Sequence, residues 1–244
     1  MASLPDPRGV GPGPDLVIFD CDGVLVDSEV ISCSVHAEVL TRNGYPITSE
    51  QVFDRFLGRS ARQAVIEVET ELGRRLPEDF DAQLKNRIFS TFRESLSPTL
   101  HIHEALGAIT QAVCVASSGS HERMRISLGC TNLYDHFAPN IFSSSEVRNG
   151  KPAPDLFLFA AERMGVAPGR CVVVEDSVSG IAGGIAAGMT VLGYYGGSHC
   201  RPGYADTLRR AGATATFADM RELPGLIAKL GQTGGALPES AASS

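Results

Sequence analysis

The sequence predicts an α/β fold in which a doubly wound parallel sheet carries a helical insertion after its first strand. Three observations lead to this prediction. Short, nearly continuous apolar runs of β-forming residues recur along the chain, which is typical of strands buried on both faces. Helical patterns separate the later runs, as in a succession of β-α-β units. A long region without a strand pattern follows the first run, and it is too long for one crossover helix.

Both ends of the chain have a composition that does not favour a packed structure. Residues 1–14 and 232–244 are rich in glycine, proline, alanine and serine, so we expect a disordered leader and a flexible tail. The leader has no apolar segment like that of a signal peptide, and no run of about 18 apolar residues occurs elsewhere. We therefore expect a cytoplasmic protein that does not bind a membrane.

Charge and cysteine content narrow the class of protein further. The formal net charge is -7, and no run of lysine or arginine could release counterions from a phosphate backbone, which argues against a nucleic-acid partner. The 6 cysteines are scattered without a zinc-binding spacing, so we expect reduced thiols. With 43% hydrophobic residues, the chain can bury the core of an enzyme.

The predicted elements follow in a definite order. LVIFD at 16–20 is the first strand. Amphipathic helical patterns come after it, and we expect a helical cap domain over residues 29–100. The other strands are expected later in the chain, as AVCVAS at 112–117, CVVVE at 171–175 and TVLGYY at 190–195. Residues 15–28 and 101–231 would then form a Rossmann-like catalytic core.

Polar residues follow three of the predicted strands at their carboxyl ends. They are Asp20 and Asp22 after the first strand, Ser117 and Ser118 at the end of the second, and Glu175 and Asp176 at the end of a later one. Because ligands bind beyond the carboxyl ends of the strands in an open parallel sheet, we expect these groups to meet at one edge.

The residue types at this edge suit the transfer of a phosphoryl group. One of two neighbouring carboxylates can attack while the other exchanges protons, and their mutual repulsion raises one pKa. Asp176, with Glu175 beside it, offers hard oxygen ligands for Mg²⁺. Ser117, Ser118 and the start of the next helix could hold phosphoryl oxygens. Lys151 would add a positive charge.

Each of these features has a structural explanation when it is taken alone. A pair of serines is usually a helix N-cap, a lysine in a loop is usually solvated, and an acidic pair after a strand is usually part of a turn. The combination of all of them favours catalysis.

Four motifs carry a resemblance to a known family. They are DCDGVLVDSE at 20–29, VASSG at 115–119, KPAPD at 151–155 and VVEDSVSGI at 173–181. Their order resembles the haloacid dehalogenase superfamily, specifically its phosphatase branch with a helical cap after the first motif, over about residues 15 to 230. The resemblance implies a phosphoric monoester hydrolase. In it Asp20 is the nucleophile that forms an aspartyl phosphate, and Asp22 is the general acid and base.

The same resemblance implies the ligands of the site. Mg²⁺ would be bound by the Asp20 carboxylate, the Asp22 backbone carbonyl and Asp176, with Glu175 in or near this set. Ser117 and Lys151 would hold the phosphoryl oxygens. The dehalogenase members of the superfamily lack the second aspartate, so the presence of Asp22 disfavours carbon-halogen cleavage.

The segment DRFLGRSARQ at 54–63 resembles the cap loop that reaches the active site in this family. Gly58 would let backbone approach the substrate. Arg59, Ser60 and Arg62 could recognise hydroxyls, a carboxylate or a second phosphate. The alternative is that both arginines are solvated at the start of a helix.

The motifs are most similar to those of sugar-phosphate and phosphogluconate phosphatases, which implies a small phosphorylated metabolite as substrate. In the sibling β-phosphoglucomutases, a cap histidine, a cap arginine and a lysine stand at the positions of Ser32, Ala61 and Ser120. These differences favour hydrolysis, and a phosphosugar mutase is the alternative. A non-catalytic sugar-phosphate sensor is a minor alternative, because a sensor does not need Asp22. The sequence leaves open whether the protein is a monomer or a dimer.

Overall fold

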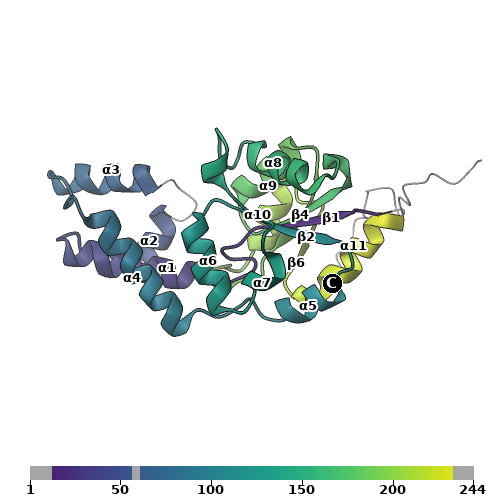
Figure 1. Ribbon diagram of the computed structural model, residues 1–244. Coiled ribbons are helices and arrows are strands. Elements are labelled where there is room, and N and C mark those ends of the chain that lie inside the picture. The colour runs from purple at the N-terminus through teal and green to yellow at the C-terminus, as the bar shows by residue number, and fades with distance from the viewer. Residues whose placement is uncertain (1–12, 57–60, 233–244) are drawn as a thin grey trace, which may run out of the picture.

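The computed structural model describes residues 13–56 and 61–232, and within these residues a parallel sheet of six strands forms the centre of the molecule (Figure 1). The strand order is β3-β2-β1-β4-β5-β6, and all neighbouring strands are parallel. The strands are β1 (Leu16–Phe19), β2 (Ala112–Ser117), β3 (Ile141–Ser143), β4 (Cys171–Glu175), β5 (Thr190–Tyr194) and β6 (Ala215–Phe217).

This sheet confirms the predicted α/β fold with a doubly wound parallel sheet. The predicted strands at 16–20, 112–117, 171–175 and 190–195 agree with β1, β2, β4 and β5 to within one residue. Two strands at the edges, β3 and β6, were not predicted. Each has 3 residues, which is too short to give a recognisable pattern.

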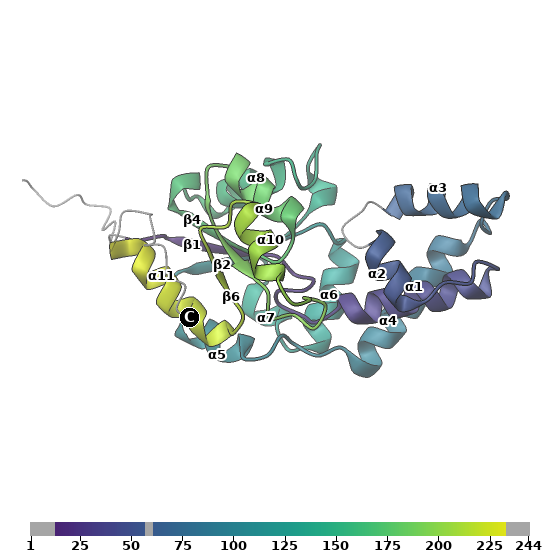
Figure 2. The same cartoon turned by 180° about the vertical axis from the view of Figure 1, so that it is seen from behind.

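Helices cover both faces of the sheet (Figures 1 and 2). Successive strand residues point to opposite faces, so Val17 and Phe19 belong to one hydrophobic cluster while Leu16 and Ile18 belong to another. The first cluster is completed by α5 (Ile102–Ala108), α6 (His121–Cys130), α7 (Tyr134–Phe137) and α11 (Leu223–Gln232). The second is completed by α8 (Asp155–Met164), α9 (Val178–Ala186) and α10 (Tyr204–Arg210).

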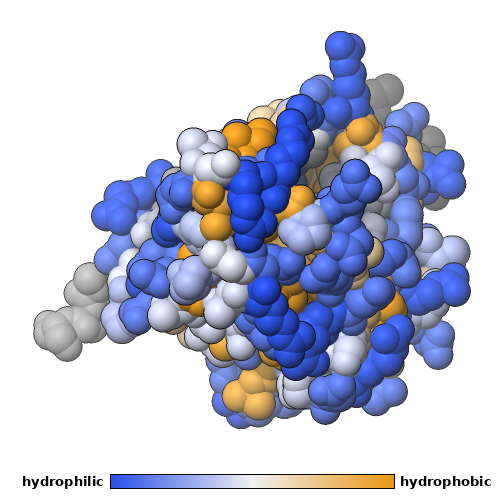
Figure 3. Space-filling view, turned by 90° about the vertical axis from the view of Figure 1, so that its left-hand side faces the viewer, coloured by the Kyte–Doolittle hydropathy of each residue, from blue (hydrophilic) through white to orange (hydrophobic). Residues whose placement is uncertain are grey.

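A helical insertion separates β1 from β2, as the sequence predicts. It consists of α1 (Glu29–Arg42), α2 (Ser49–Phe56), α3 (Ala61–Leu72) and α4 (Phe80–Ser95), which lie together beyond one end of the sheet (Figure 1). α1 packs on α2 and α4, and α4 packs on α6 of the core. Figure 3 shows that this end of the molecule is mostly hydrophilic, with small separate hydrophobic patches. The boundaries of the cap domain at residues 29 and 100 stay predictions.

The two connections between the insertion and the core run side by side. The Asp27 amide donates to the Ser97 carbonyl over 3.1 Å, and the Thr99 amide donates to the Leu25 carbonyl over 3.0 Å. Both connections start or end near the carboxyl end of β1. The insertion is therefore joined to the core at the edge where the polar residues lie.

Most of the predicted leader and tail lies outside the described residues, which include only 13, 14 and 232 of those two segments. No helix in the described part of the chain has the length and apolar character needed to cross a membrane. None of the 6 cysteines forms a disulfide, as expected for reduced thiols.

Candidate active site

The predicted polar groups meet where the sheet changes winding direction. β1 lies between β2 and β4, and its last residue Phe19 is opposite Val174 of β4. The Asp20 amide donates to the Val174 carbonyl over 3.0 Å, which brings Asp20 beside Glu175. In this strand order the chain continues to opposite sides from β1 and β4, and ligands bind at such a switch point.

Lys151 is buried between two carboxylates. Its Nζ lies 2.6 Å from Asp20 Oδ1 and 2.6 Å from Glu175 Oε1, and only 4% of its side chain is exposed. Burial alone would lower the pKa of Lys151, but the two carboxylates raise it above its usual range. Lys151 is therefore a fixed cation of the site and not a solvated loop lysine.

Three acidic side chains form a compact buried group. Carboxylate oxygens of Asp20, Glu175 and Asp176 lie within 4.8 Å of one another. Burial raises the pKa of Asp20 well above its usual range, and the charges of Glu175 and Asp176 add to this while Lys151 opposes it. Packing such like charges away from water is costly unless cations balance them. Hard oxygen donors in this arrangement fit Mg²⁺.

Glu175 is held rigidly by its neighbours. Its Oε2 accepts hydrogen bonds from the Ser177 amide and hydroxyl, both over 2.9 Å, while Oε1 contacts Lys151. A Cβ atom on Gly180 would lie 1.8 Å from Glu175 Oε1, so only glycine fits there. Glu175 is therefore held in an orientation that keeps one carboxylate oxygen on Lys151.

Asp176 has a histidine partner that the sequence did not indicate. His199 Nε2 lies 3.0 Å from Asp176 Oδ2. Burial would lower the pKa of His199, but the hydrogen bond to Asp176 raises it to about 10. Burial raises the pKa of Asp176, and His199 opposes that shift. His199 thus supplies positive charge beside the acidic group.

Asp22 has partners different from those of Asp20. Arg123 donates to it through Nε over 2.9 Å and Nη2 over 2.8 Å, and the Ser28 hydroxyl donates over 2.6 Å. Burial alone would raise the pKa of Asp22, but Arg123 and Ser28 lower it. The pKa values of the two aspartates therefore move apart: burial and the charges of Glu175 and Asp176 raise that of Asp20, while Arg123 and Ser28 lower that of Asp22.

The predicted serine pair divides between the site and the surface. Ser117 ends β2 with 1% exposure, and its Oγ accepts a hydrogen bond from the Gly119 amide over 3.1 Å. A Cβ on Gly119 would lie 3.4 Å from Ser117 Oγ and 3.5 Å from Asp22 Oδ2. The backbone of Gly119 therefore lies close to both side chains. Ser118 is exposed. The N-cap of α6 is Ser120, so neither predicted serine serves as that cap.

Sequence reasoning missed Ser28, Arg123 and His199. Ser28 stands inside the first motif, and it precedes α1 without capping it because its hydroxyl is bonded to Asp22. Arg123 follows the second motif by one helical turn. His199 lies in the loop after β5, and the strand-end rule applied to that strand could have found it.

Only part of the predicted cap loop lies within the described residues. Gly58, Arg59 and Ser60 lie outside the described residues. Arg62 is exposed in the first turn of α3. The contribution of these residues to specificity stays a prediction.

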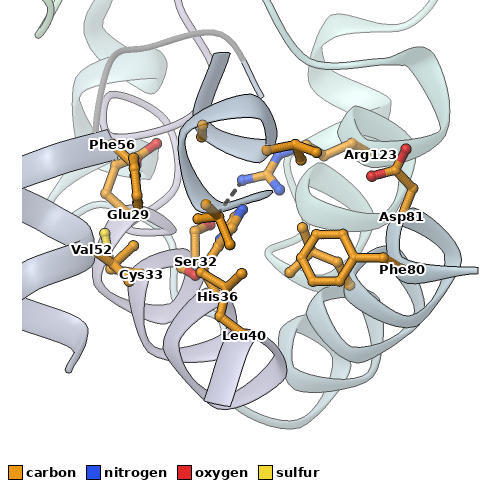
Figure 4. Close-up of a pocket in the computed structure, with 14 residues that line it drawn as sticks. Glu29, Ser32, Cys33, His36, Leu40, Val52, Phe56, Phe80, Asp81 and Arg123 are labelled. Carbon is orange, nitrogen blue, oxygen red and sulfur yellow. Dashed lines mark hydrogen bonds between the residues drawn. The ribbon is translucent and has the colours of Figure 1, made fainter. Parts of the chain in front are cut away.

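A cavity of about 310 Å³ lies between the helical insertion and α6 (Figure 4). Its polar lining comes from Glu29, Ser32, His36, Asp81 and Arg123. Burial, followed by the charges of Asp22 and Asp176, raises the pKa of Glu29 to about 7. The rest of the lining is apolar apart from one thiol, and it comprises Cys33, Leu40, Val52, Phe56, Ala64, Val65, Val68, Phe80 and Leu84.

Comparison with known proteins places this arrangement in context. Residues 14–188 match the family model of the haloacid dehalogenase-like hydrolases. The 6-phosphogluconate phosphatase of Escherichia coli (strain K12) is 33% identical over 189 residues, which cover 77% of this chain and 86% of that protein.

Two solved structures are similar over nearly the whole chain. A haloacid dehalogenase-like protein of unknown function from Agrobacterium tumefaciens str. C58 has a TM-score of 0.79 and 40% identity, covering 89% of this chain and 99% of its own. A hydrolase of the same family from Deinococcus radiodurans R1, solved with bound phosphate and sodium, has a TM-score of 0.74 and 32% identity, covering 93% and 99%.

Proposed function

The chain belongs to the haloacid dehalogenase-like hydrolases, and from that premise we propose that it is a Mg²⁺-dependent phosphatase. Its substrate would be a small phosphorylated metabolite of the sugar-phosphate or phosphogluconate type, and the reaction would pass through an aspartyl phosphate on Asp20. The relative from Escherichia coli, named for 6-phosphogluconate, supports this substrate class.

The observation that carries the proposal is the environment of Asp20. Its carboxylate ends a buried strand at the switch point of the sheet and contacts the buried Lys151. A carboxylate nucleophile needs a cation close by, because the incoming phosphoryl group is itself negatively charged. Lys151 supplies that charge and the Ser117 hydroxyl lies at the end of the neighbouring strand, so both could hold phosphoryl oxygens.

The residues divide the chemistry into two steps. In the first, an Asp20 oxygen bonds to phosphorus, the bond to the ester oxygen breaks, and Asp22 gives that oxygen a proton. In the second, Asp22 takes a proton from water, which bonds to phosphorus and releases phosphate from Asp20. Arg123 favours the ionised form of Asp22 that accepts this proton.

Asp20, Asp176 and the Asp22 carbonyl would hold Mg²⁺, with Glu175 beside them. The ion would neutralise phosphoryl charge and align the Asp20 carboxylate.

The experiment is an assay of phosphate release from a panel of phosphorylated metabolites with Mg²⁺, which should include phosphogluconate, hexose phosphates, pentulose phosphates and phosphoglycolate. We expect turnover of a sugar phosphate or phosphogluconate, and none after chelation. Asp20→Asn, which keeps the size of the side chain, should be inactive. Release of phosphate by Asp20→Asn at the parent's rate would contradict the proposal. Transfer of phosphate to a second position on the sugar without release would instead indicate a mutase.

A further inference from the structure

The cavity between the insertion and α6 is connected to Asp22, the proposed acid and base, through Arg123, which lines the cavity. Arg123 Nη2 donates to Asp22 Oδ1 over 2.8 Å and to the Ser32 hydroxyl over 3.1 Å. In Figure 4 the guanidinium points toward Ser32, and a dashed line marks this hydrogen bond. A group attached to the ester oxygen near Asp22 therefore has the cavity next to it.

One face of α1 forms a wall of this cavity. Glu29, Ser32 and His36 stand three and four residues apart, which puts them on the same side of the helix. They lie nearer the start of α1 than Leu40, which belongs to the apolar part of the lining. The polar groups of this wall are thus gathered toward the end of α1 that adjoins the catalytic edge.

Two side chains of the cavity lining, Arg123 and Glu29, can form further hydrogen bonds. A guanidinium has five N–H donors, and the bonds of Arg123 to described residues involve Nε and Nη2 but not Nη1. The Glu29 carboxylate accepts no hydrogen bond from the described part of the chain, although burial disfavours its charge. Leaving such a carboxylate unpaired is costly, which points to a ligand as its partner.

The charge of the lining disfavours an anionic chain end. Among the described residues that line it, Arg123 is the one arginine and is already paired with Asp22, and none is a lysine. Glu29 and Asp81 bring two acidic groups to the same cavity. Within the described lining, a carboxylate at the far end of a substrate would meet like charge or apolar side chains.

We propose that Glu29, Ser32 and Arg123 form a subsite that recognises the hydroxyl groups of a neutral polyol chain bound to the ester oxygen. Glu29 accepts hydrogen bonds from these hydroxyls, Arg123 donates through Nη1, and Ser32 can do either. The apolar lining contacts the C–H groups of the chain. This inference rests on the proposed phosphatase function, and it selects neutral sugar and polyol phosphates over phosphogluconate.

Three six-carbon phosphate esters test the subsite: glucitol 6-phosphate has neutral hydroxyls, 6-phosphogluconate adds a carboxylate, and n-hexyl phosphate has neither. We expect the parent enzyme to have the highest kcat/KM for glucitol 6-phosphate, by at least about tenfold, the scale of a hydrogen bond to a charged group. Glu29→Gln should lower that value by about 10- to 100-fold and change kcat/KM for hexyl phosphate by less than about threefold. Ser32→Ala should act in the same direction more weakly.

Glu38→Gln is the matched control, because Glu38 is on the same helix but pairs with Arg87 and Arg42. It should leave all three values unchanged. Equal losses on all three esters in Glu29→Gln, or a parent preference for 6-phosphogluconate, would overturn the subsite.

Phosphate release from 4-nitrophenyl phosphate separates the subsite proposal from the phosphatase proposal. If it persists while the subsite fails, the phosphatase proposal stands, and if it and all three esters fail, both proposals fall.

Discussion

The edge of the sheet and the cavity under the helical insertion differ in how their charged side chains are paired. At the edge, Asp20 is paired with Lys151, Asp22 with Arg123, and Asp176 with His199. In the cavity, the Glu29 carboxylate has no hydrogen bond from the described part of the chain. Paired charges at the edge suit a preorganised reaction site, whereas the half-buried Glu29 carboxylate can still accept hydrogen bonds. Under the two proposals, the edge carries the reaction and the cavity carries substrate choice, with Arg123 shared between them.

Loss of Lys151 should give the largest effect on the catalytic edge. Lys151→Met leaves Asp20 and Glu175 as unpaired buried carboxylates, so we expect unfolding free energy to fall by about 3 to 5 kcal/mol in chelator. Turnover should fall by at least about 10³-fold, since a phosphoryl ligand is also lost. Urea unfolding and phosphate release measure both. The exposed Lys85→Met is the control, and a Lys151→Met protein as stable and active as the parent would refute this role.

Loss of the proton-transferring carboxylate should be the next largest effect. Asp22→Asn cannot exchange the proton, so turnover of alkyl phosphates should fall by about 10²-fold or more. 4-Nitrophenyl phosphate should suffer less in the first step, because its leaving group needs no proton. Steady-state kinetics with both esters measure the difference. Full activity on alkyl phosphates would remove Asp22 from the mechanism.

A smaller effect is expected on metal affinity. Asp176→Asn removes one charged oxygen donor of the acidic group, so Mg²⁺ should bind more weakly by more than about tenfold. Calorimetric titration of the chelator-treated protein measures this. The exposed Asp135→Asn serves as the comparison, and equal Mg²⁺ affinity in both variants would place the metal elsewhere.

A substitution in the cavity should raise the free energy of unfolding, whereas Lys151→Met at the edge should lower it. Because the pKa of Glu29 rises from its ordinary 4.5 to about 7 on folding, the folded protein binds this proton more tightly than the unfolded chain. Ionisation of Glu29 therefore lowers stability as pH rises from 4.5 to 7. Glu29→Gln should be more stable than the parent above pH 7 by about 1 to 2 kcal/mol, with no difference below pH 4.5. Urea unfolding across this range in chelator checks it, and a variant less stable at pH 8 would contradict it.

The sequence allowed the edge to be predicted far better than the cavity. Asp20, Ser117, Glu175 and Asp176 could be placed together because the carboxyl ends of parallel strands converge whatever the details of packing. Lys151 could be named as a positive charge, but its role in holding phosphoryl oxygens required the family resemblance, since nothing in a loop sequence shows that its side chain folds inward.

Other residues could not be predicted for reasons that are equally physical. Arg123 and Glu29 lie on helices whose rotation about their axes is set by tertiary packing, so their sequence neighbours do not reveal which way they point. The short strands β3 and β6 gain their order from pairing with β2 and β5 and carry little pattern of their own.

The central claim is that phosphate is transferred to Asp20 before it reaches water. Rapid acid quenching after mixing with substrate tests it directly, with mass spectrometry of the peptide that contains Asp20. The account predicts a peptide heavier by one phosphoryl group at Asp20, absent in Asp20→Asn. Asp22→Asn slows the second step, and 4-nitrophenyl phosphate needs no proton in the first. Release of phosphate from this ester by Asp22→Asn with no phosphorylated Asp20 at any quench time would contradict the account.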